Sequence, residues 1–180
     1  WYVPLGLKAW FIDRGIASER VVELDWWQSH RFDERVDITF TPAQHWSRRG
    51  MWDTNKTLWG GWAVDIDGFN SWFAGDTGYN AVYFKEIGER LGPFRLAMIP
   101  IGAYAPRYFM SPVHIDPAQA VAVHLDVRAQ QSVPVHWGTF ALTIEPFLEP
   151  PRLLNEAMQQ RGLPRDSFRP LRIGETLVLD

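Results

Sequence analysis

The sequence predicts an α/β fold, in which buried strands alternate with helices whose ends are marked by capping residues. Residues 1–5 and 20–24 are predicted strands around a short helix that ends at a glycine, which is the pattern of a β-α-β unit. The continuous apolar run at residues 96–101 predicts a buried strand. Asp116 is expected to cap a further helix, with Pro117 in its first position. With 180 residues and 46% apolar content, the chain is long enough for one domain, or for part of a larger one.

The remaining elements follow from hydrophobic periodicity and from turn residues. A hairpin is predicted at Asp67-Gly68, because this dipeptide favours a tight turn between two strands. Asn80 is expected to cap a helix that stops at Gly92. The expected core side of that helix carries Val82, Phe84, Ile87 and Leu91. Further strands are predicted at residues 36–41, 58–66, 71–74, 132–135 and 176–179. The helix that Asp116 caps is expected to continue over 118–127, and a further helix is expected after Pro150-Pro151, up to Gln160.

Charge and cysteine content exclude several classes of function. The chain has 18 basic and 21 acidic residues without a run of like charges, so we expect no nucleic-acid partner. It has no cysteine, which excludes disulfides and thiolate ligands and leaves His, Asp and Glu to hold any metal ion. No apolar stretch approaches the ~20 residues that a membrane helix needs, and no signal segment is evident. We therefore expect a cytoplasmic protein, with or without membrane association.

Two further features bear on what the chain is. It begins at Trp1 without an initiator methionine, already inside an apolar strand, so we expect the sequence to be a piece of a longer protein. It contains ten tryptophans, an unusual number for this length. Tryptophan suits both a packed core and an interface with lipid, and composition leaves this choice open.

Three polar residues share one kind of position: His45, Asp76 and His136 each come soon after a predicted strand, in a loop rich in glycine or proline. Strand ends at one edge of a sheet converge, so such loops can bring distant side chains to one point. Imidazole and carboxylate groups are suitable zinc ligands, and a carboxylate can be shared by two ions. The sequence therefore predicts a metal site at this edge.

Each histidine and Asp76 also has a simpler interpretation. Asp76 lies in Gly-Asp-Thr-Gly, where an aspartate can serve as an ordinary turn residue. His30, in a charged stretch, is expected to be a solvated loop residue, and His124, in mid-helix, to be structural. His114 precedes the helix that Asp116 caps, so helix-entry packing and an active-site role remain equally open for it.

Six strings of the sequence, in order, resemble the family of phospholipases D that hydrolyse N-acyl-phosphatidylethanolamine, within the metallo-β-lactamase superfamily. The strings are YVPLGL at 2–7, ELDWW at 23–27, TPAQHW at 41–46, FAGDTGY at 73–79, IPIGAY at 99–104 and HWGTF at 136–140. The resemblance implies a four-layer αββα sandwich, of which this chain supplies roughly the C-terminal half.

The resemblance also implies a site and a reaction. His45 would be a ligand of one zinc ion, His136 a ligand of a second, and Asp76 the carboxylate between them; iron or manganese can occupy similar sites. His114 would lie beside the metals, where it could contact the substrate phosphate or assist proton transfer. Metal-activated hydroxide would attack the phosphodiester of a phospholipid, releasing an N-acylethanolamine and phosphatidic acid.

One part of the superfamily pattern is missing, because residues 1–180 contain no His-x-His-x-Asp-His run. The remaining ligands could come from an upstream segment or a separate chain, or be lost; we expect them from the protein's own N-terminal half. We expect this chain alone to be inactive and to fold only against that half. Two alternatives remain open. One is a hydrolase of the same fold that acts on another small ester, lactone or phosphodiester, with or without contact to a membrane surface. The other is a non-catalytic structural domain or subunit.

Overall fold

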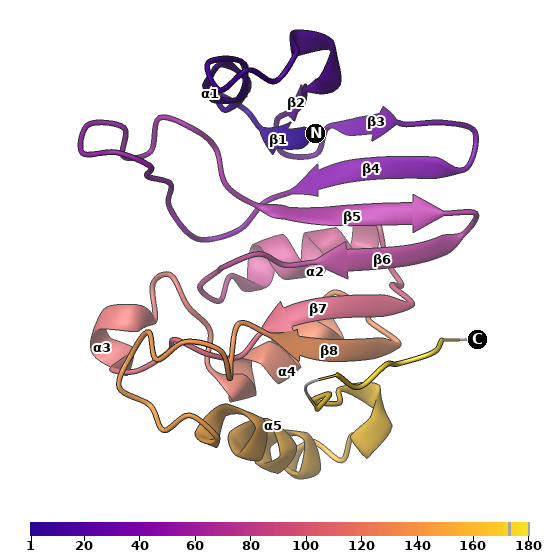
Figure 1. Cartoon of the computed structure of the whole chain (residues 1–180). Helices are drawn as coiled ribbons and strands as arrows, with labels where there is room; N and C mark the ends of the chain where they lie inside the picture. Colours follow the sequence, from indigo (N-terminus) through magenta and orange to yellow (C-terminus); the bar gives the residue numbers. More distant parts are fainter. Residues whose placement is uncertain (173, 180) are drawn as a thin grey trace.

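The computed structural model describes residues 1–172 and 174–179, and its centre is a mixed sheet of six strands (Figure 1). The strand order is β3-β4-β5-β6-β7-β8. Pairing is antiparallel from β3 to β6 and parallel from β6 to β8. The strands are β3 (Ser29–Arg31), β4 (Val36–Thr41), β5 (Gly61–Ile66), β6 (Phe69–Phe73), β7 (Leu96–Pro100) and β8 (Gln131–Val135). The predicted α/β fold is confirmed.

Helices cover one face of this sheet. The helices are α1 (Lys8–Ile12), α2 (Ala81–Arg90), α3 (Arg107–Met110), α4 (Pro117–Asp126) and α5 (Glu149–Gln160), with 3-10 turns η1 (Ser18–Arg20) and η2 (Arg165–Ser167). Figure 1 shows α2 and α4 behind the sheet and α5 beyond α4. Trp72 and Ile99 of the sheet are fully buried in one cluster with Phe84 of α2, Val121 of α4 and Leu154 of α5. Burial of each such side chain stabilises the fold by roughly 1.5–3 kcal/mol.

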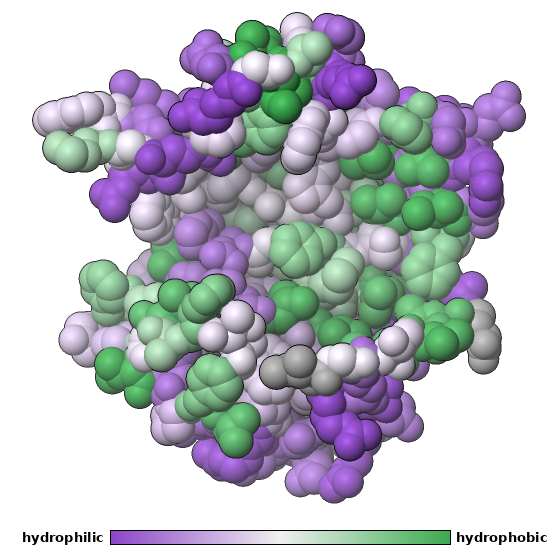
Figure 2. Space-filling view, viewed as in Figure 1, coloured by the Kyte–Doolittle hydropathy of each residue, from purple (hydrophilic) through white to green (hydrophobic). Residues whose placement is uncertain are grey.

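The other face of the sheet carries apolar side chains with no helix over them among the described residues. Successive residues of a strand point to opposite faces of the sheet. Because Trp72 of β6 points toward the helices, the residues on either side of it, and the residues of β5 and β7 that pair with those, point to the other face. Phe73 pairs with Trp62 of β5 and with Met98 of β7. Phe73 remains 41% exposed, and Figure 2 shows hydrophobic side chains across this face.

The N-terminal segment forms the predicted β-α-β unit. Strands β1 (Tyr2–Pro4) and β2 (Val22–Leu24) pair in parallel as a separate two-stranded sheet, with α1 between them in the chain. Val3, Leu7 and Val21 form its small core.

The residues predicted to turn the chain or to cap helices do so in the structure. Asp67 and Gly68 turn the chain between β5 and β6 with positive φ angles of 52° and 82°. The Asn80 side chain accepts from the backbone N–H groups of Val82 and Tyr83 at the start of α2. Asp116 forms a capping box with Gln119 at the start of α4.

Four predictions about elements are wrong in detail. Val82 is 71% exposed, because α2 turns Phe84 and Ile87 toward the core and leaves Val82 outside that stripe. Residues 176–179 form no strand. His30 lies in the short edge strand β3, not in a loop, and its Nδ1 is 3.0 Å from the Tyr2 hydroxyl. Helix α5 begins at Glu149, so the two prolines occupy its first turn, where no backbone N–H is needed.

Candidate metal centre

The predicted site residues are brought together at one edge of the sheet. Strands β4, β6, β7 and β8 all end at this edge, as their arrowheads show in Figure 1. His45 follows β4, Asp76 follows β6, and His136 follows β8 directly. His114 lies in the loop between β7 and α4. Four loops that are distant in sequence therefore contribute one side chain each.

The donor atoms lie within a few ångströms of one another. Those of His45, Asp76 and His114 are all within 4.8 Å of each other, close enough to surround one cation. His136 Nε2 lies 3.5 Å from Asp76 Oδ1. The ring centroid of His114 is 5.3 Å from that of His45 and 5.4 Å from that of His136. Asp76 is thus the one carboxylate that the cluster shares.

Three ring nitrogens of this cluster are buried without a hydrogen-bond partner. They are His45 Nε2, His114 Nδ1 and His136 Nδ1. Only one other side-chain atom of the described residues, on Gln131, is in the same condition. His45 Nδ1 lies 2.9 Å from the Trp46 carbonyl, and a proton donated there leaves the lone pair on Nε2. A buried nitrogen with a free lone pair beside a carboxylate is suited to bind a metal ion.

The ionisable side chains of the site shift one another's pKa values. Burial raises the pKa of Asp76, but the adjacent His136 and the other two imidazoles outweigh it, so that the pKa lies below its ordinary value. Contact with Asp76 raises the pKa of His136 against the effect of burial. Burial lowers the pKa of His114 to about 4, although Asp76 opposes this. At neutral pH Asp76 is therefore charged and His114 is not.

The backbone at His136, whose side chain contacts Asp76, has an unusual conformation. His136 has a φ of +57°, which is uncommon for a residue other than glycine and often marks a functional position. Its carbonyl folds so close to Gly102 that a Cβ at Gly102 would lie 2.1 Å from the oxygen. Only glycine fits at this position without displacement of the His136 loop.

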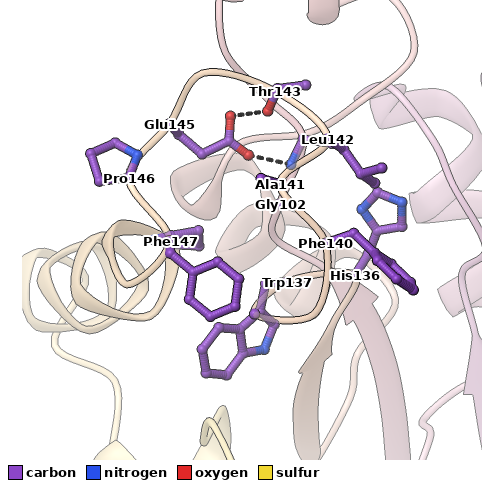
Figure 3. A pocket seen from close by; sticks show the side chains of 13 residues that line it. Gly102, His136, Trp137, Phe140, Ala141, Leu142, Thr143, Glu145, Pro146 and Phe147 are labelled. Atoms are coloured by element: carbon purple, nitrogen blue, oxygen red, sulfur yellow. Dashed lines mark hydrogen bonds between the residues drawn. The ribbon is translucent and has the colours of Figure 1, made fainter.

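Cavities adjoin the cluster on two sides. A cleft of about 340 Å³ is lined by His45 and Asp76 together with Trp46, Arg48 and Trp59, among others. A smaller cavity of about 70 Å³ lies beside His136. Figure 3 shows the latter with Trp137 and Phe147 at its wall and with Glu145 hydrogen-bonded within the loop that follows β8. The cluster is therefore reachable by a ligand from outside.

Sequence reasoning missed two residues that hold the loops of the site. The Glu145 carboxylate accepts from the backbone N–H groups of Ala103 at 2.6 Å and Ala105 at 3.2 Å, which ties the loop after β7 to the loop after β8. Gln44, next to His45, bonds to two other loops. No local signal distinguishes Glu145 from an exposed loop glutamate, whereas the adjacency of Gln44 to a candidate ligand could have drawn attention to it.

The remaining two histidines lie away from the cluster. His124 is only 3% exposed within α4, and its Nδ1 lies 2.7 Å from Ser132 Oγ. This is the structural role expected for it. His30 is at the opposite part of the sheet, on the edge strand β3.

The fold and the His/Asp cluster indicate a metallo-β-lactamase type of domain. The sequence matches the family described as beta-lactamase superfamily domain over residues 2–137, and the chain belongs to this family. Over 99% of its length it also superposes on Igni18, a novel metallo hydrolase from Ignicoccus hospitalis, with a TM-score of 0.74 at 23% identity and 68% coverage of that chain. The predicted fold class is thus confirmed.

Two curated relatives narrow the comparison. The chain is 48% identical, over 97% of its length, to the N-acyl-phosphatidylethanolamine-hydrolyzing phospholipase D 1 of Caenorhabditis elegans, and covers 51% of that protein. It is 37% identical, over 100% of its length, to the mitochondrial enzyme of the same description from Saccharomyces cerevisiae, and covers 39% of it. The predicted resemblance is confirmed, and the chain spans about half or less of the length of these relatives.

No helix among residues 1–172 and 174–179 has the length and apolar character needed to cross a membrane.

Proposed function

We propose that this chain is part of a metal-dependent phosphodiesterase of the phospholipase D type, which hydrolyses N-acyl-phosphatidylethanolamine or a similar lipid. The observation that carries the proposal is that three histidines clustered with Asp76 each keep a buried ring nitrogen without a hydrogen-bond partner. Leaving a buried polar atom unpaired costs roughly 1–3 kcal/mol, so three such atoms within one cluster of side chains favour a ligand that binds there. The two curated relatives support the choice of substrate.

The residues have distinct roles in this proposal. His45 and His136 would each help to hold a divalent ion, and Asp76, which is charged and close to all three histidines, would be the carboxylate they share. Bound zinc, or iron or manganese, would neutralise charge on the phosphoryl oxygens and make hydroxide accessible at neutral pH. His114 contacts the substrate phosphate or assists proton transfer.

A lipid substrate is supported by apolar side chains that project from the same loops. Exposed large hydrophobic residues occur in the loops after β4, β7 and β8, which also carry His45, His114 and His136. They are Met51, Trp52, Tyr108, Phe109, Phe140, Leu142, Ile144, Phe147 and Leu148, each at least 50% exposed. Figure 2 shows several hydrophobic side chains gathered around α3 and the loop after β8. Peripheral contact with a membrane surface would bring these loops, and hence the site, to the lipid.

The proposed activity belongs to a larger unit than residues 1–180. We propose that an N-terminal half of the same domain supplies the remaining metal ligands and a second sheet that covers the apolar face around Trp62, Phe73 and Met98. Burial of this face is worth roughly 25 cal/mol per Å² of apolar surface, which supports obligate association of the two halves. This chain alone would then be inactive.

A substrate panel tests the proposal with the complete protein. N-acyl-phosphatidylethanolamine presented in vesicles should be hydrolysed to an N-acylethanolamine and phosphatidic acid. Chelation of the metal should abolish this activity, and added metal should restore it. A lactone and a cyclic phosphodiester should be turned over far more slowly. Preference for either of these would reject the lipid proposal but retain a hydrolase, whereas a metal-free, inactive protein would favour a structural domain.

A further inference from the structure

Gln44 is hydrogen-bonded to each of the two loops that face its own. Its side-chain Nε2 donates to the Pro112 carbonyl at 2.9 Å, two residues before His114. Its backbone N–H donates to Thr77 Oγ1 at 2.9 Å, next to Asp76. Its backbone carbonyl accepts from Gly78 N–H at 2.7 Å. One residue thus ties the loops of His45, Asp76 and His114 together.

The contact between these loops leaves no free space. A Cβ at Gly78 would lie 2.4 Å from the Pro112 carbonyl oxygen and 2.7 Å from Gln44 Nε2. Asn80 adds a bond from its Nδ2 to Gln44 Oε1 at 3.3 Å, so both ends of the Gln44 amide are engaged. The Gln44 amide therefore fixes the separation of the Asp76 loop from the loop that carries His114.

His114 depends on this backbone anchor, because its ring Nδ1 has no hydrogen-bond partner of its own among the described residues. The rest of its loop is held from the other side, where Arg107 donates to the His114 carbonyl at 2.9 Å and to Gln119 Oε1 at 2.8 Å. The only side-chain bond that connects the His114 loop to the loops of His45 and Asp76 in the described residues is that from Gln44 to Pro112.

We propose that Gln44 is a positioning residue, which sets the distance between His114 and the cluster formed by His45 and Asp76. This inference rests on the proposed function, in which His114 acts on the substrate phosphate. A displacement of about 1 Å at a reacting group can lower turnover by about 10²-fold, while binding of the rest of the substrate is unaffected.

A double-mutant cycle in the complete protein tests this role. The variants are Gln44→Met, which keeps the shape of the side chain but removes both amide bonds, His114→Ala, and the two combined. Gln159→Met, at an exposed glutamine of α5, is the matched control. We expect Gln44→Met to lower kcat about 10- to 100-fold with KM and metal content close to those of the unsubstituted protein. The double variant should turn over within about threefold of His114→Ala alone, since both changes remove one contribution.

Other results would reject the inference. If the kcat of the double variant fell by the product of the two single losses, Gln44 would act independently of His114. If Gln44→Met lost bound metal, Gln44 would instead support the metal-binding residues. Hydrogen exchange of the backbone amides of Ser111, Val113 and His114 gives a readout that needs no activity. It should accelerate in Gln44→Met and not in the control, and unchanged protection would overturn the inference. Full activity of His114→Ala, with accelerated exchange in Gln44→Met, would instead reject the proposed role of His114 and keep the anchor.

Discussion

His124 is buried and the three histidines of the candidate metal centre are half-buried, and their ring nitrogens differ in hydrogen bonding. His124 Nδ1 is bonded to Ser132 Oγ, and its ring stacks on Phe168 with centroids 5.6 Å apart. His45, His114 and His136 each leave a buried nitrogen unpaired. Both the structural histidine and the candidate functional ones therefore have a buried ring nitrogen, and what distinguishes them is whether that nitrogen has a hydrogen-bond partner. An unsatisfied imidazole beside a carboxylate is a position suited to bind a ligand.

The largest expected effect is on the metal centre. Replacement of His45, Asp76 or His136 by Ala in the complete protein should lower turnover by about 10²–10³-fold or more, because each removes a group that holds charge at the reacting centre. Metal content, measured by mass spectrometry, should fall in parallel. His124→Ala should leave metal content and turnover per folded molecule close to normal. Full turnover in Asp76→Ala would refute the assignment of the site.

The elements that local sequence predicts well are those with strong local signals. The alternating, β-branched run at 36–41 is strand β4, and the caps Asn80 and Asp116 start α2 and α4, because their side chains bond to backbone groups within three residues. The sequence also predicts that Asp76 follows a strand, because Gly-Asp-Thr-Gly comes directly after an apolar run.

What could not be predicted depends on contacts between distant segments. The exposure of Val82 follows from how α2 rotates against α4, which places Gly88 against the backbone of Asp126 and Val127. The apolar residues at 176–179 look like a strand locally, but they pair with no strand among the described residues. The sequence likewise could not show that Gln44 reaches Pro112, 68 residues further along the chain.

An intermediate effect is expected on stability at His124. His124→Ala removes a buried ring and leaves Ser132 Oγ unpaired, so the free energy of unfolding should fall by roughly 2–3 kcal/mol. Ser132→Ala should cost less, because it deletes one hydroxyl without opening a large cavity. Urea unfolding of the complete protein measures both. Equal stability of His124→Ala and the unsubstituted protein would show that the His124–Ser132 contact is not structural.

The smallest expected effect is the pH dependence of stability that His124 contributes. Burial lowers the pKa of His124 from 6.5 to about 4, so the unfolded chain binds a proton there that the folded protein does not. Stability from this group is fully present above pH 6.5 and is lost as the pH falls toward about 4, with a slope approaching 1.4 kcal/mol per pH unit. Unfolding free energies of the unsubstituted protein and of His124→Gln should therefore converge by about 1 kcal/mol between pH 7.5 and about pH 5.5. The difference between the two proteins removes the contributions of His114 and of the metal ligands, which both share. A constant difference across this range would mean that His124 keeps its ordinary pKa in the folded protein, and its contrast with the metal-centre histidines would then rest on Ser132 alone.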